Sequence, residues 1–212
     1  MDLQQLSNAV VAGNAPQAKA LTEAALAEGV PAGTIVNDGL IAAMGVVGER
    51  FGCGEIYVPE MLLSARAMQM ALALLEPLMT EADVVSRGTV VIGTVKGDVH
   101  DIGKNIVTIM LKGSGFTVHD LGVDVPTERF VEAIPEFRPD VIGISALLTT
   151  TMPGMKTVIE AIENAGLRDQ VKVMVGGAPV TEMYARSVGA DGYGRDAGEA
   201  AEQAKRLVRA SE

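Results

Sequence analysis

The second half of the chain alternates short runs of apolar, β-branched residues with amphipathic stretches, and this alternation constrains the fold more than any other feature. The first run, Thr89–Val95, is too short for a core helix and is predicted to be a buried strand. Further strands are expected at residues 116–121, 141–145, 171–175 and 190–193, and helices at 102–112, 127–134, 153–165, 180–187 and 197–209. Such a series predicts a doubly wound, five-stranded parallel sheet with right-handed crossovers, which we place at residues 88–212.

Residues up to about Thr80 have helical spacing and almost no strand signal, and the pattern changes near residues 81–83. Two short helices are expected at Leu3–Val11 and Pro16–Glu28. Two further helices each have one apolar face, formed by Val36, Leu40, Met44, Val47 and Phe51 in the third and by Met61, Ala65, Met68, Leu72, Leu75 and Met79 in the fourth, for which Pro59 suits the first turn. Four helices with short connections predict an antiparallel bundle at residues 1–85.

Composition and charge exclude several classes of protein. Hydrophobic residues make up 48% and charged residues 21%, as in a soluble globular protein, and we expect no stretch long and apolar enough to span a bilayer. The net charge of −10 would repel a phosphate backbone, so nucleic acid is a poor candidate partner. The first residues lack the pattern of a secretory signal, which indicates a cytoplasmic protein. Cys53 is interpreted as a free thiol, because no second thiol or nearby histidine completes a metal site.

Three unusual loops follow strands of the predicted sheet. A doubly wound sheet binds ligands beyond the carboxyl ends of its strands, where the strand order reverses, and in the Rossmann-like sheet of flavodoxin-like order this point lies between the first and third strands. The loop after the first strand contains His100, and the loop after the third strand, residues 145–151, is rich in hydroxyl groups. The loop after the fourth strand opens with Gly176-Gly177. We expect all three at the ligand-binding edge, whereas His119, on the second strand, is expected to be structural.

The chemistry of these loops suits a planar ligand with a long tail. Asp98 precedes His100 by two residues, so one ring nitrogen can bind a metal while the carboxylate accepts a hydrogen bond from the other. Paired glycines let a ligand approach the backbone closely, and hydroxyl groups can hydrogen-bond a tail. Each feature also has a plainer interpretation: His100 and Asp98 as helix caps, Thr149–Thr151 as a polar turn and Gly176-Gly177 as a tight strand exit.

Together the three loops resemble the cobalamin-binding domain of methionine synthase, B12-dependent mutases and corrinoid methyl carriers. The family pattern is Asp-x-His-x-x-Gly, followed by Ser-x-Leu and then by Gly-Gly. This chain has all three parts, in order and at the family's spacing: Asp98, His100 and Gly103, then Ser145 and Leu147, then Gly176 and Gly177.

This resemblance implies that the chain binds cobalamin or a related corrinoid, whose lower base leaves cobalt and is replaced by His100. Asp98 would modulate His100, and Thr151, at a position where the family often has serine, would donate a hydrogen bond to Asp98. The other cofactor-binding residues that the resemblance implies in these loops are Asp101, Gly103, Ser145, Leu147, Thr149, Gly176 and Gly177.

The N-terminal half favours one branch of the family. Methyl carriers place a four-helix bundle over the corrin as a cap, whereas mutases react against a separate barrel. Residues 57–61 resemble the start of a cap helix, where Tyr57 and Met61 would shield the methyl group, while Met68 and Met79 are expected in the bundle core. The resemblance therefore covers both modules and matches the stand-alone corrinoid proteins of methanogens and acetogens.

A carrier of this kind would cycle between Co(I) and methyl-Co(III). It would take the methyl group of methylamines, methanol or aryl methyl ethers from a substrate-specific methyltransferase and pass it to a second methyltransferase, with a reductive activator as a further candidate partner. No residue suggests independent catalysis, so we expect a non-catalytic corrinoid subunit whose cap moves about a linker at residues 81–86. The alternatives are a B12-dependent sensor or regulator, a mutase small subunit and a ligand-free receiver-like scaffold.

Overall fold

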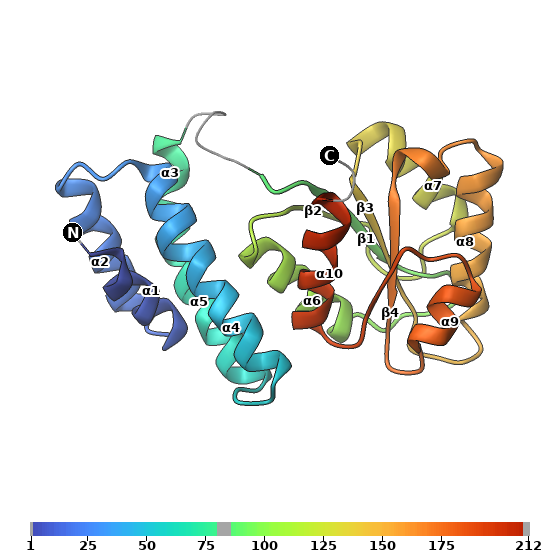
Figure 1. Cartoon of the computed structure of the whole chain (residues 1–212), viewed down its shortest axis with the longest axis horizontal. Helices are drawn as coiled ribbons and strands as arrows, with labels where there is room; N and C mark the ends of the chain where they lie inside the picture. The colour runs from blue at the N-terminus through green and yellow to red at the C-terminus, as the bar shows by residue number, and fades with distance from the viewer. Residues whose placement is uncertain (1, 80–85, 210–212) are drawn as a thin grey trace. The chain divides into compact units, whose positions relative to one another are not determined.

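The computed structural model describes residues 2–79 and 86–209 and divides into two compact units. One unit holds Met1–Ser86 and Gly113–Gly115, and the other holds Arg87–Lys112 and Phe116–Glu212. Figure 1 shows helices in the first unit and a sheet flanked by helices in the second. The predicted domain limits, 1–85 and 88–212, and the flexible linker at 81–86 stay predictions, because residues 80–85 and 210–212 lie outside the described residues.

The N-terminal unit is a bundle of four helices, as predicted. Its segments are α1 (Leu3–Val11), α2 (Ala15–Ala27), the third helix formed by α3 (Ala32–Thr34), η1 (Ile35–Ile41) and α4 (Ala42–Gly52), then α5 (Val58–Leu75) and the short η2 (Glu76–Leu78). The side chains of Asp2 and Asn14 accept hydrogen bonds from first-turn amides and begin α1 and α2. The π-helix η1 was not predicted. At its Gly39 a Cβ would lie 3.0 Å from Leu6 Cδ2 of α1, so the two helices approach closely there.

The apolar face predicted for the fourth helix is buried along most of α5. Residues 61, 65, 68 and 75 are buried, residue 72 is half-buried, and Met79 lies beyond the end of the helix. Pro59 lies in the first turn, as expected. Ser64 Oγ donates a 3.1 Å hydrogen bond to the Val11 carbonyl of α1, which ties α5 to the bundle.

The expectation that no stretch could span a bilayer was wrong for one segment. Val58–Leu78 is long enough and, with a mean hydropathy of 1.2, apolar enough to cross a membrane by length and composition alone. Alanine, leucine and methionine supply this hydropathy, and they also form the face that α5 packs against the bundle. We interpret the segment as the core helix of the bundle.

The C-terminal unit contains the predicted parallel sheet. Its strands are β1 (Thr89–Thr94), β2 (Thr117–Asp120), β3 (Val141–Ser145), β4 (Lys172–Gly176) and β5 (Gly192–Gly194), in the order β2-β1-β3-β4-β5. Its helices are α6 (Ile102–Gly113), α7 (Thr127–Phe137), α8 (Pro153–Asn164), η3 (Arg168–Gln170), α9 (Glu182–Ser187) and α10 (Ala197–Arg209). The order reverses between β1 and β3, as predicted, with α7, α8 and α9 on one face and α6 and α10 on the other (Figure 1).

Two helices differ in length from the prediction by two or more residues. α7 continues through Pro135 to Phe137 and ends where Arg138 adopts a left-handed conformation, with φ 47°. Proline has no N–H to donate to the carbonyl four residues before it, so Pro135 weakens the helix, which ends two residues later. α9 begins only at Glu182, because Thr181 Oγ1 accepts a 3.2 Å hydrogen bond from the Tyr184 N–H and caps the helix.

The strand register brings the loops that follow β1, β3, β4 and β5 to one edge of the sheet. Apolar residues of β1, β3 and β4 form the core with α7 and α8, and at Gly93 a Cβ would lie 2.9 Å from the Phe130 ring. Strand register places Thr94 beside Ser145, Ser145 beside Gly176, and Gly176 beside Gly194. The loops after β1, β3, β4 and β5 therefore start from one row of residues.

Candidate functional site

The loop between β1 and α6 carries a buried carboxylate that holds a half-exposed imidazole. Asp98 is fully buried, whereas the His100 side chain is 45% exposed. Asp98 Oδ1 lies 2.7 Å from His100 Nδ1 and also accepts from the His100 backbone N–H at 3.1 Å. An ionised carboxylate can only accept, so Nδ1 carries the hydrogen, and in the neutral imidazole Nε2 then keeps its lone pair. This is the tautomer that a metal ligand requires.

The other oxygen of Asp98 is held by the loop between β3 and α8. Asp98 Oδ2 accepts from Thr151 Oγ1 at 2.7 Å, from the Leu147 N–H at 2.7 Å and from the Leu148 N–H at 3.3 Å. Burial acts to raise the pKa of Asp98, but the hydrogen bonds from Thr151, Leu147 and His100 outweigh it and hold the pKa well below its ordinary value. The predicted hydrogen bonds from His100 and Thr151 to Asp98 are thus present, and Asp98 is anionic at neutral pH.

Exposed apolar side chains lie on the two loops that meet at Asp98. Val99 and Ile102, on either side of His100 in the sequence, are 70% and 75% exposed. Leu147 and Leu148, from the loop whose amides bind Asp98, are 40% and 42% exposed. Exposed apolar residues that cluster around a polar group are typical of a ligand site. A flat, largely apolar macrocycle could rest on them with its metal above His100.

The glycine pair lies beside the third strand, and the fold itself requires one of the two glycines. At Gly177, with φ 133°, a Cβ would lie 1.9 Å from the Ala146 carbonyl oxygen, so no other residue fits. Gly176 is paired with Ser145 in the sheet, and a Cβ there would lie 3.1 Å from the Gly194 carbonyl oxygen. At Gly103, by contrast, a Cβ would meet nothing within 4 Å, so the fold alone does not explain that glycine.

The remaining predicted site residues make no hydrogen bond to Asp98 or His100 among those found in the described part of the chain. Asp101 is exposed, and its carboxylate accepts from Asn105 Nδ2 at 3.1 Å. Thr149 is exposed on the β3–α8 loop. Tyr57, 69% exposed, and Met61, fully buried, belong to the N-terminal unit, so their contact with a corrin stays a prediction.

Sequence patterns did not reveal several residues that support the loop. Buried Thr94 donates from Oγ1 to the His100 carbonyl at 3.1 Å. Lys104, only 2% exposed at its side chain, forms an ion pair with Asp120 at the end of β2. The carboxylate of Asp124, in the β2–α7 loop, accepts from the Gly97 N–H at 2.7 Å. Lysine in a first helical turn normally indicates a solvated position, so the sequence contained no signal for the buried ion pair.

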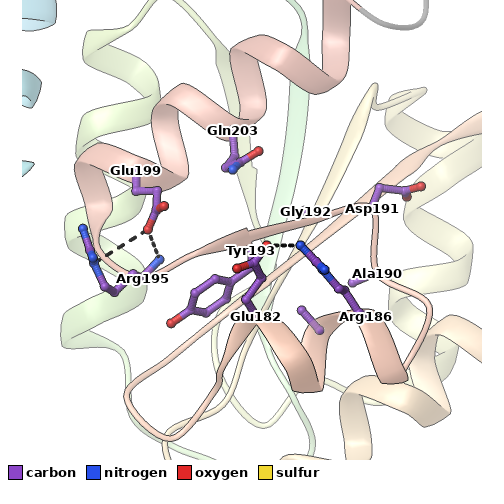
Figure 2. A pocket seen from close by; sticks show the side chains of 10 residues that line it. Glu182, Arg186, Ala190, Asp191, Gly192, Tyr193, Arg195, Glu199 and Gln203 are labelled. Carbon is purple, nitrogen blue, oxygen red and sulfur yellow. Dashed lines mark hydrogen bonds and ion pairs between the residues drawn. The ribbon is translucent and has the colours of Figure 1, made fainter.

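A separate pocket of about 410 Å³ lies beside β5 (Figure 2). Its lining comes from α9, β5 and α10 and carries both signs of charge. Arg186 pairs with Glu182 at 2.5 Å and Arg195 with Glu199 at 3.8 Å, and the Tyr193 hydroxyl donates to the Val180 carbonyl at 3.0 Å. These groups are already paired, and none comes from the His100 or Thr151 loops, so we assign this pocket no part in the site.

Comparison with known proteins agrees with this geometry over nearly the whole chain. Residues 88–202 and residues 2–76 each match a family described as a B12 binding domain. The chain is 47% identical to the dimethylamine corrinoid protein of Methanosarcina barkeri, over 97% of both chains. The chain belongs to the methylamine corrinoid proteins. Its identity to the trimethylamine corrinoid protein of the same organism is 45%, over 89% of this chain and 88% of that one.

This corrinoid protein is also similar to solved structures in its fold. The methanol:cobalamin methyltransferase complex of Methanosarcina barkeri matches it with a TM-score of 0.86 at 31% identity, over 98% of this chain and 79% of that chain. The expected fold class, a helical cap followed by a five-stranded parallel α/β domain, is confirmed, as are the corrinoid cofactor and the function of a methyl carrier. The residues that contact the cofactor stay a prediction.

Proposed function

We propose that this corrinoid protein carries a methyl group from dimethylamine, with His100 as the lower axial ligand of cobalt. Several dimethylamine corrinoid proteins, at 44–49% identity, support this donor. The trimethylamine relative, at 45%, makes trimethylamine the second candidate. The bound corrinoid would supply the cobalt that takes up and releases the methyl group, alternating between Co(I) and methyl-Co(III).

The observation that carries the ligand assignment is the 2.7 Å contact between Asp98 Oδ1 and His100 Nδ1. The chain's own residues would act on the metal through this contact. Anionic Asp98 fixes the His100 tautomer and makes the imidazole a stronger donor, while Thr151 stabilises the anionic form of Asp98 by donating to its second oxygen. Val99, Ile102, Leu147 and Leu148 would keep water from the lower face of the ring. His100 Nε2 makes none of the hydrogen bonds found within residues 2–79 and 86–209, so it is available to the metal.

Three partners follow from this role. A dimethylamine-specific methyltransferase would deliver the methyl group, as the similar methanol:cobalamin methyltransferase complex suggests. A second methyltransferase would remove it, and a reductive activator would restore Co(I) after accidental oxidation. The N-terminal unit would act as the cap, with Tyr57 and Met61 toward the methyl group.

A spectroscopic experiment tests the ligand assignment. Purified protein loaded with hydroxocobalamin is compared with His100→Ala and with His119→Ala as the matched control, because His119 stacks on Phe137 at 4.1 Å and lies on β2. We expect His100→Ala to change the visible spectrum of the bound cobalt and His119→Ala to leave it unchanged. An identical spectrum for wild type and His100→Ala would contradict the assignment.

A coupled assay tests the methyl donor. The reduced holoprotein is mixed with methyltransferases specific for monomethylamine, dimethylamine, trimethylamine or methanol, each with its substrate, and methylation of cobalt is followed by absorbance. We expect the dimethylamine pair to methylate the carrier fastest. Faster methylation by another pair would replace dimethylamine as the donor and leave the His100 assignment untouched.

A further inference from the structure

The β2–α7 loop holds the backbone of Asp98 from outside the predicted relay. Asp124 Oδ1 accepts from the Gly97 N–H at 2.7 Å, and the Asp124 N–H donates to the Asp98 carbonyl at 2.9 Å. These two hydrogen bonds lie on either side of the Asp98 α-carbon. The Asp98 carboxylate is held by the β3–α8 loop, so Asp98 is fixed at its backbone by one loop and at its side chain by another.

Asp124 has a left-handed backbone conformation that glycine would adopt with less strain, so the presence of a carboxylate at this position needs an explanation. Its φ is 52°, and among the described residues only Arg138, at the end of α7, is another non-glycine with positive φ. L-residues are disfavoured in this region, although aspartate tolerates it better than most. Glycine would adopt the conformation without strain but could not accept from Gly97. The hydrogen bond to Gly97 therefore gives a physical reason for aspartate at this position.

The loop that carries Asp124 is itself anchored at both ends. At the start, Asp120 pairs with buried Lys104 of α6 and accepts from the Gly122 N–H at 2.8 Å. At the end, the Val125 N–H donates to the Thr94 carbonyl of β1 at 2.9 Å. Asp124 is thus fixed relative to both β1 and α6, the two elements that bound the His100 loop.

We propose that Asp124 is a positioning residue for His100, which sets how firmly the imidazole binds cobalt. The proposal rests on the lower-ligand role proposed for His100. Without the Asp124 carboxylate, Gly97 and Asp98 lose one of the two hydrogen bonds that join their backbone to the β2–α7 loop. The Asp98 carboxylate then shifts relative to the cobalt, and His100 with it. Weaker coordination follows even though neither residue has changed.

Two substitutions separate this effect from ordinary loss of stability. Asp124→Gly removes the acceptor and also the backbone strain, so its unfolding midpoint should stay close to that of wild type. Asp124→Asn keeps an acceptor oxygen and the tolerance of positive φ, so it should behave like wild type. The holoprotein is prepared with cobalamin, reduced to Co(II) and examined by electron paramagnetic resonance after labelling with [15N]histidine. A histidine ligand then splits the signal into doublets, whereas the cofactor's own 14N base gives triplets.

We expect doublets in wild type and Asp124→Asn, and a large loss of doublets in Asp124→Gly and His100→Ala. The Co(II)/Co(I) midpoint potential of Asp124→Gly should rise, by about 59 mV for each tenfold loss of His100 affinity for Co(II). Doublets and a potential equal to those of wild type in Asp124→Gly, with His100→Ala clearly different, would overturn the role of Asp124 alone. Wild type without doublets would overturn the His100 assignment and the Asp124 role with it.

Discussion

Replacing Thr151 with valine removes one hydroxyl from the relay while keeping the branched shape of the side chain. Thr151 Oγ1 lies 2.7 Å from Asp98 Oδ2 and 2.9 Å from the Leu148 carbonyl oxygen, and its one hydrogen favours the charged acceptor. A hydrogen bond to a charged group contributes about 1.5–3 kcal/mol when the partner is buried. We expect Thr151→Val to lower the free energy of unfolding by about that amount at pH 7.

The effect should depend on pH in one direction. The hydrogen bonds to Asp98 outweigh its burial and hold its folded-state pKa well below the ordinary value of an aspartate. Stability from a lowered pKa is present in full above the unfolded-state pKa of about 3.9 and is lost as the pH falls through the folded-state pKa. Thr151→Val raises the folded-state pKa, so its difference from wild type should be complete at neutral pH and shrink only as the pH falls through the folded-state pKa values of the two proteins, below the ordinary range of an aspartate.

Urea unfolding of the corrinoid-free protein at pH 7 and at about pH 3.5, followed by circular dichroism, measures this difference. Thr149→Val is the matched control, because Thr149 is an exposed threonine of the same loop with no hydrogen bond recorded in the described part of the chain. It should stay within about 0.5 kcal/mol of wild type. A loss below about 0.5 kcal/mol for Thr151→Val at pH 7, or a loss that is larger at about pH 3.5 than at pH 7, would refute the reasoning.

Three further substitutions test the loops. Gly177→Ala places a Cβ 1.9 Å from the Ala146 oxygen at a φ of 133°, so it should lower the free energy of unfolding in urea by more than about 3 kcal/mol or prevent folding. Gly103→Ala meets no atom within 4 Å and should keep or slightly raise stability, while weakening retention of corrinoid in gel filtration. Lys104→Met leaves Asp120 without its cation and should cost about 1–3 kcal/mol in urea unfolding, since the Asp120 side chain is 32% exposed, whereas Lys112→Met at an exposed position should be near neutral.

The sheet and the main site residues could be predicted because each is marked by a short pattern of neighbouring residues in the sequence. Short β-branched runs fall on the strands to within about two residues, and glycine pairs and a lone histidine mark the loops at the strand ends. Parallel pairing then brings those loops to one edge without further information. The hydrogen bond from His100 to Asp98 could be predicted from their two-residue spacing, whereas the one from Thr151, on a loop distant in the sequence, was implied by the resemblance to the cobalamin-binding domain.

What could not be predicted depends on contacts between elements. The π-helix η1 arises where Gly39 meets Leu6 of another helix, and apolar spacing contains no sign of the extra residue. Lys104 is buried only because Asp120 ends a neighbouring strand nearby. The sequence does not distinguish Asp124 from other polar residues in turns, because its role depends on its positive φ and on its hydrogen bond with Gly97. The membrane expectation failed because alanine-rich core helices and membrane helices have similar composition.

The row formed by Thr94, Ser145, Gly176 and Gly194 has a thermodynamic consequence. Because these residues come together only when four strands have paired, a corrinoid can recognise the folded C-terminal unit but not the unfolded chain. Binding at a hundredfold excess over the dissociation constant would then add about 2.7 kcal/mol to the stability of that unit. Supply of the cofactor would thereby govern how long the carrier survives proteolysis, which digestion with and without corrinoid would measure.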